Sequence, residues 1–168
     1  MIRQRSCKKR QSGVGMIEVL VAVLVMSIGF LAVAQMQIRG MRYNQSTYLR
    51  SQAAMMLKDM TDRMRSNRVG VKNGSYNAMT TANDKALPDC VTNAIPCTPA
   101  ELAAKDIYEW SMNIHPPAAQ TNAIPTFPAA NAVGKVTQSA GVYDVSIEWT
   151  EIIDGTSENQ SMTVQFMP

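Results

Sequence analysis

The chain has 168 residues, enough for one domain and an anchor, and its formal net charge of +3 is unevenly distributed. The first thirteen residues carry no acidic side chain and five basic ones, Arg3, Arg5, Lys8, Lys9 and Arg10. Without these five, eleven basic and thirteen acidic side chains remain, a charge of about −2, which argues against a nucleic-acid partner.

An apolar segment follows this basic leader. Val19 to Ile38 are twenty consecutive residues without a formal charge, which span about 30 Å as a helix, the hydrocarbon thickness of a bilayer. Fewer basic residues follow the segment than precede it. The positive-inside rule therefore predicts a cytoplasmic leader, a single membrane pass and a C-terminal domain on the opposite side.

Glu18 stands at the N-terminal edge of this segment, five residues after Gly13. An ionisable group within a membrane costs about 2.5 kcal/mol or more on insertion scales, so we expect Glu18 to have a dedicated partner. Two simpler interpretations stay open. A secretory signal peptide cut after Ala34 does not explain Glu18 or the helical pattern that continues beyond that residue. A plain N-terminal anchor leaves Glu18 without a purpose.

The helical pattern continues past the apolar segment and predicts one helix from about Val14 to about Asn67, with Gly70 as its stop. The residues of its apolar stripe, which we expect to pack against the C-terminal domain, are Ile38, Met41, Tyr48, Leu49, Gln52, Ala53, Met56, Leu57, Met60 and Met64. On the solvated side, Asp59–Arg63 and Lys58–Asp62 have the spacing of ion pairs.

Three cysteines are present, and Cys7 belongs to the leader. The remaining pair, Cys90 and Cys97, fits an oxidising compartment, where a disulfide would contribute about 2–3 kcal/mol by the chain-entropy estimate. A metal site is the weaker alternative, because His115 is the only histidine of the chain.

The C-terminal region predicts a helix followed by strands. Thr98, Pro99 and Glu101 form a helix start with a capping box, and the helix of about fifteen residues carries Trp110 as a core anchor. A loop over 115–132 follows, then a short strand at 135–139, a turn at 139–141 and two strands of alternating polarity around 143–149 and 162–166. An antiparallel sheet of three or four strands results, and the acidic residues Asp144, Glu148 and Glu151 are expected to point outward.

No motif of an enzyme is present. The sequence lacks a glycine-rich phosphate loop, a nucleophile elbow and a metal-ligand cluster, and His115 alone cannot build a catalytic constellation. We therefore expect no catalytic residue, no metal and no cofactor.

The run from Gly13 to Glu18 resembles the prepilin signal of type IV pilins and type II secretion pseudopilins. The resemblance implies that prepilin peptidase cuts after Gly13 and methylates Val14. It also implies that Glu18, then the fifth residue, pairs with the N-terminus of an adjacent subunit during assembly. Val14 and Gly15 depart from the phenylalanine start that is frequent in this family, so Glu18 sets the register.

A second stretch, Asp59-Met60-Thr61-Asp62-Arg63-Met64-Arg65-Ser66-Asn67, resembles the PilV class of minor pilins, as does the order of cysteine, helix and Trp110. The resemblance implies an α+β pilin-like fold and a minor pilin required for type IV pilus assembly in the inner membrane and then in the pilus. Its partners would be prepilin peptidase, other minor pilins, the major pilin and the inner-membrane assembly platform. A type II secretion pseudopilin and an adhesion module at the pilus tip are the alternatives.

These expectations divide the chain into four segments. Residues 1–13 form the leader, 14–38 the transmembrane half of the helix, 39–67 its amphipathic half and 68–168 the globular domain.

Overall fold

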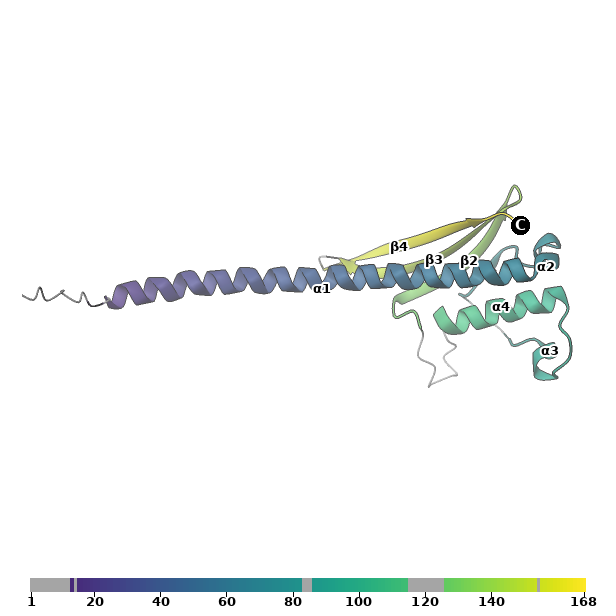
Figure 1. Ribbon diagram of the computed structural model, residues 1–168, viewed down its shortest axis with the longest axis horizontal. Helices are drawn as coiled ribbons and strands as arrows, with labels where there is room; N and C mark the ends of the chain where they lie inside the picture. Colours follow the sequence, from purple (N-terminus) through teal and green to yellow (C-terminus); the bar gives the residue numbers. More distant parts are fainter. Residues whose placement is uncertain (1–12, 14, 83–85, 115–125, 154) are drawn as a thin grey trace, which may run out of the picture. The chain divides into compact units, whose positions relative to one another are not determined.

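The computed structural model describes residues 13, 15–82, 86–114, 126–153 and 155–168 (Figure 1). In chain order the elements are α1 (Met16–Ser66), α2 (Arg68–Lys72), β1 (Met79–Thr80), α3 (Asp89–Thr92), α4 (Pro99–Ile114), β2 (Ala130–Ser139), β3 (Val142–Ile153) and β4 (Thr156–Phe166). The chain divides into two compact units, Met1–Arg42 and Tyr43–Pro168. The second unit contains the sheet and all the helices except the first part of α1.

Helix α1 confirms the long helix that the sequence predicts, but Ile38, Met41 and Tyr48 of the expected packing stripe are exposed. Its C-terminal part buries one stripe of side chains, because apolar residues recur there at helical spacing: Leu49, Ala53, Met56, Leu57, Met60, Thr61 and Met64. The expected stop at Gly70 is wrong. Gly70 lies inside α2, and Asn67 ends α1 instead, where its side-chain Oδ1 accepts a hydrogen bond from the Gly70 amide at 3.1 Å.

The sheet has four antiparallel strands in the order β1-β2-β3-β4. The predicted turn between β2 and β3 is the two-residue loop Ala140-Gly141, whose positive φ angles of 50° and 84° suit a hairpin with the twist of its strands. The loop expected over 115–132 is wrong at its end, because residues 130–132 belong to β2, which contains a bulge between Ala130 and Val133. Residues 115–125, and with them His115, lie outside the described residues.

One core joins α1, α4 and the sheet. Trp110 of α4 is fully buried, and its indole N–H donates to the Met56 carbonyl at 3.2 Å. Gly134 of β2 permits this packing, since a Cβ there would come within 2.5 Å of the Trp110 ring. The expected α+β pilin-like fold is therefore confirmed: a long N-terminal helix whose C-terminal part packs on a small antiparallel sheet, with one further long helix.

The predicted alternation of inward and outward side chains on β3 is present with one exception. Tyr143, Val145, Ile147 and Trp149 are buried, as their spacing predicts. Glu151 was expected to point outward and does not. It follows Trp149 by two residues, so it shares the inner face, where it is buried and its Oε1 accepts a hydrogen bond from the Trp149 indole at 2.6 Å.

Candidate assembly site

The first part of the candidate site is the start of α1. Gly13 is exposed and precedes the helix, and Val14 lies outside the described residues. Glu18 is the acidic residue of the first helical turn, and its amide donates to the Gly15 carbonyl at 3.0 Å. A carboxylate in this turn also suits the positive end of the helix dipole. The Glu18 side chain is exposed, and within the described part of the chain it makes no ion pair.

Among the described residues, the apolar side chains of α1 from Val19 to Tyr43 have no internal partner. Every described residue of α1 from Met16 to Tyr43 is exposed, including Phe30 at 71 % and Leu31 at 67 %. An 18-residue window of α1 reaches a mean hydropathy of 2.6, so this helix is long and apolar enough to cross a membrane. Contiguous apolar surface of this extent requires a partner other than water.

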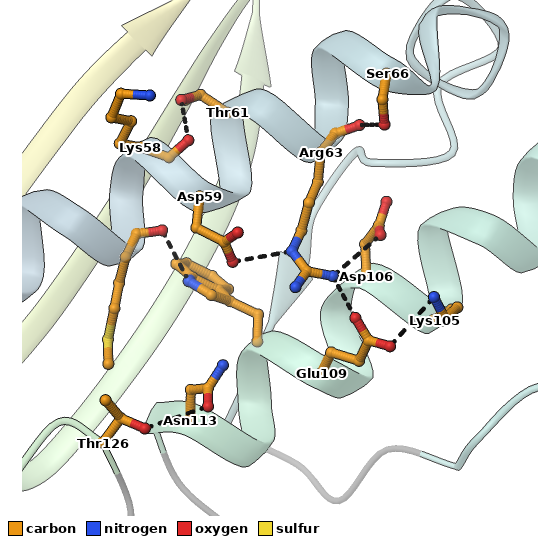
Figure 2. A network of polar contacts seen from close by, with 12 residues as sticks. Lys58, Asp59, Thr61, Arg63, Ser66, Lys105, Asp106, Glu109, Asn113 and Thr126 are labelled. Atoms are coloured by element: carbon orange, nitrogen blue, oxygen red, sulfur yellow. Dashed lines mark hydrogen bonds and ion pairs between the residues drawn. The ribbon is translucent and has the colours of Figure 1, made fainter.

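The second part of the candidate site is an ion-pair network that ties α1 to α4. Arg63 binds Asp59 of its own helix at 2.9 Å and reaches across to Asp106 at 3.5 Å and to Glu109 (Figure 2). Lys105 binds the other oxygen of Glu109 at 3.2 Å. Burial on its own lowers the pKa of Arg63, but its hydrogen bonds to Glu109 and Asp59 raise that pKa above the ordinary value.

A buried cluster continues the network toward α2. The Tyr76 hydroxyl donates to Asp106 at 2.5 Å, and the Asn67 side-chain amide donates to the Tyr76 hydroxyl at 3.1 Å and to the Pro99 carbonyl at 2.7 Å. Burial raises the pKa of the Asp106 carboxyl, although the Tyr76 hydrogen bond and the Arg63 charge oppose that change. Burial, and next the contact with Asp106, raise the pKa of Tyr76. The cluster fixes the end of α1 to the start of α4.

The loop before α4 is closed covalently. Cys90 and Cys97 form a disulfide, with their Cα atoms 5.1 Å apart. The next residue begins the predicted capping box: the Thr98 amide donates to Glu101 at 2.7 Å, and the Glu101 amide donates to the Thr98 hydroxyl at 3.3 Å. These bonds hold the first turn of α4, whose Pro99 carbonyl receives Asn67.

Sequence reasoning found part of this network. It placed the ion pairs Asp59–Arg63 and Lys58–Asp62 correctly, and both are present. It assigned Arg63 to the solvated side, whereas the Arg63 side chain is only 25 % exposed because α4 covers it. Tyr76 was missed altogether. The charged residues on one face of α4 are a sequence signal for the α1–α4 contact. The sequence alone, however, does not identify Arg63 as their partner.

Among the described residues there is no group of three or more potential metal ligands. The carboxylates that lie close together, Asp106 and Glu109, are both occupied by Arg63, so the cluster holds two helices together.

Comparison with known families agrees with this geometry. Residues 8–34 match the prokaryotic N-terminal methylation motif, which covers Gly13, Val14 and Glu18. Residues 35–108 match the Tt1218-like family, described as type IV pilin Tt1218, and this match includes the α1 stretch with Arg63 and α4 as far as Tyr108. No curated protein and no solved structure matches the chain.

Proposed function

Because the chain is a type IV pilin, a structural subunit and not an enzyme, we propose that it is a minor pilin required for pilus assembly. The observation that carries the proposal is the start of α1: one carboxylate at Glu18, without an internal partner in the described chain, precedes apolar side chains that are all exposed as far as Tyr43. Such an N-terminus suits a subunit that leaves the bilayer and packs its helix against the helices of other subunits. We assign it to the PilV class on the stretch Asp59–Asn67.

The leader is removed on the cytoplasmic side. Prepilin peptidase cuts between Gly13 and Val14 and methylates the new N-terminus at Val14. The motif match over residues 8–34 supports this register, and only this cut makes Glu18 the fifth residue of the mature chain. Gly15 is the competing glycine, but a cut there would place Glu18 third.

Glu18 sets the position of the subunit in the filament. A carboxylate in a low-dielectric environment either stays neutral or finds a cation. The cation that a pilin supplies is the N-terminal amine of an adjacent subunit. Pairing the two charges fixes the axial stagger between helices, because a helix displaced by one turn, about 5.4 Å, leaves both charges buried without a partner.

The topology follows from the charge on either side of the apolar run. The basic leader stays in the cytoplasm, residues 14–38 cross the inner membrane once, and residues 39–168 stand in the periplasm until the subunit enters the filament. The disulfide between Cys90 and Cys97 suits that compartment. Partners in assembly are the other minor pilins, the major pilin and the inner-membrane platform.

Deletion of the gene tests the proposal. Loss of surface filaments, restored by the intact gene, is the expected result. Intact filaments with failed export of secreted proteins would instead identify a type II secretion pseudopilin. Intact filaments with lost attachment to surfaces would identify an adhesion module at the tip, and either outcome overturns the assembly role.

A further inference from the structure

The two edges of the sheet differ in how they are protected. The β1 edge is two residues long, and the chain continues directly into Thr81, whose amide and hydroxyl are both bonded to Gly134 of β2, at 2.9 and 2.8 Å. The β4 edge is eleven residues long and pairs with β3 in unbroken register from Thr156 to Phe166. On its other side, every second residue directs its backbone N–H and C=O away from the sheet, and β4 has no strand neighbour there in the described part of the chain.

From Gln160 to Phe166 the β4 edge also lacks the devices that keep edges from pairing. Lysine, proline, inward charges and bulges normally prevent a second strand from joining. β4 contains no lysine and no proline, and its pairing with β3 shows no bulge, while its one charged residue, Glu158, lies opposite Glu151 on the inner row near the start of the strand. The seven residues 160–166 are uncharged and include Thr163, Val164 and Phe166, residue types that favour strands.

The inner row of β4 is incompletely covered. Its members alternate toward α1, and Phe166 is buried while Val164 is 39 % exposed and Met162 is half-buried. The corresponding row of β3 is fully buried from Tyr143 to Trp149. A further strand beside β4 would bury Val164 and Met162 in the way that the side chains of a central strand are buried.

The helix beside this edge is basic. Two contacts place it there: the Arg50 guanidinium donates to the Gln160 side chain at 3.1 Å, and Arg65 lies 5.5 Å over the Phe166 ring. Lys58 and Asp62 lie between Arg50 and Arg65 along α1 at helical spacing. The Lys58 side chain is exposed, and the Asp62 carboxylate binds both Lys58 and Arg65. Arg68 and Arg65 then line a pocket with Phe166 at the end of β4. This row of α1, with Arg68, carries four cations against one anion.

We propose that the β4 edge accepts an extended strand of another pilin subunit, with acidic side chains on the row that faces α1. Backbone hydrogen bonds to the open edge supply affinity, and the basic row formed by Arg50, Lys58, Arg65 and Arg68 selects the charge of the incoming strand. The inference rests on the chain assembling with other pilins. It does not depend on the position of the subunit along the filament.

A photo-crosslinking side chain at Thr163 tests the proposal in the full-length protein, expressed in cells that form pili. Thr163 is exposed on β4 and opposite Ser146, away from the core. The same side chain at Phe30, in the exposed apolar part of α1, is the control for assembly. The proposal predicts adducts from both sites with other pilins, and mass spectrometry should locate the Thr163 adduct in a strand of the partner.

The outcomes separate this proposal from the assembly role. Pilin adducts from Phe30 without a pilin adduct from Thr163 would overturn the β4 proposal and leave assembly intact. Absence of pilin adducts from both sites would overturn both. Adducts of Thr163 with a second copy of this chain alone, or with a protein that is not a pilin, would also contradict the proposed occupant.

Charge reversal tests the selected chemistry. Lys58→Glu is expected to reduce the Thr163 adduct at least fivefold, because a glutamate would repel an acidic strand. Lys72→Glu makes the same charge change at a residue that is not part of this basic row, and it should leave the adduct within twofold. Equal effects of the two variants would overturn the charge complementarity.

Proline substitution tests the backbone bonds. Gln160→Pro and Ser161→Pro remove neighbouring amides that point to opposite sides of β4. The variant whose missing amide faces β3 loses a backbone hydrogen bond to that strand, so its melting temperature falls. The other removes only an outward amide, so it should keep the melting temperature and lose the Thr163 adduct. Retention of the adduct in that variant would contradict pairing at the edge.

Discussion

The two parts of α1 are both rich in apolar residues, yet they use them differently. From Met16 to Arg42 every residue is exposed, so the helix presents apolar side chains all round. From Tyr43 to Ser66 the apolar side chains form one stripe, which includes the fully buried Met60 and Met64, while Lys58 and Asp62 face water. An all-round apolar helix needs an apolar solvent or other helices, and an amphipathic one needs only its own domain.

The difference teaches where each part finds its stability. The stripe around Met60 is explained within the chain, because Trp110 and the sheet cover it. Nothing in the described chain covers the apolar side chains before Arg42, and Glu18 has no internal ion pair there. The first part of α1 therefore acts through other molecules, and substitutions in the two parts should have separable effects.

The largest effect is expected for Glu18→Ala. Cleavage of the leader should continue, while incorporation into sheared filaments falls tenfold or more, because the N-terminal amine of the adjacent subunit loses its partner. Ser27→Ala is the control, since within the described residues the Ser27 hydroxyl bonds only the Val23 carbonyl of its own helix. Immunoblots of sheared filaments measure incorporation, and normal recovery of Glu18→Ala would refute the role of this carboxylate.

Methionine truncation should destabilise only one part of the helix. Met60→Ala creates a cavity in the core and is expected to cost about 2–5 kcal/mol of unfolding free energy. Met26→Ala, at a position that is 63 % exposed, should change it by less than about 0.5 kcal/mol. Denaturation in detergent micelles, followed by the fluorescence of the buried Trp110 and Trp149, measures both. Equal losses would show that the two parts are not distinct.

Removal of the disulfide should act on the domain alone. Replacing Cys90 and Cys97 by serine is expected to cost about 2–3 kcal/mol of unfolding free energy by the chain-entropy estimate. The same fluorescence measurement applies to the uncleaved precursor, which keeps Cys7, with Cys7→Ser as the matched control. Unchanged stability of the double variant, or an equal loss in the control, would contradict a structural role for the bond.

The smallest effect is expected at Asp106, as a change in pH dependence. Burial raises the pKa of its carboxyl, so the protonated form is favoured in the folded state. The resulting stability is fully present below the ordinary pKa near 4 and is lost as pH rises through the raised value. Asp106→Asn keeps an acceptor for the Tyr76 hydroxyl and should remove this decline. Parallel curves of unfolding free energy against pH for the two proteins would contradict the assignment.

The sequence predicted those features that depend on local spacing. Helical periodicity identified α1, and the capping box at Thr98 identified the start of α4. Strict alternation identified the inner face of β3 as far as Trp149. These signals are local because each depends on hydrogen bonds or side chains within a few residues.

Features that depend on distant partners could not be predicted in this way. Asn67 ends α1 because Tyr76 and Pro99 receive its side chain, so Gly70 was the wrong stop. Glu151 is inside the domain because the Trp149 indole satisfies it there. Arg63 is covered because α4 returns across it. The sequence contains the donors and acceptors in each case, but only the folded structure determines which donor meets which acceptor.

N-terminal mass spectrometry of the mature protein tests the central claim most directly. The account predicts a chain that begins at Val14 and carries one methyl group on its N-terminal amine, with Glu18 as the fifth residue. A chain that begins at Gln35 would contradict it, because cleavage after Ala34 would remove the apolar part of α1 and make the first segment a secretory signal.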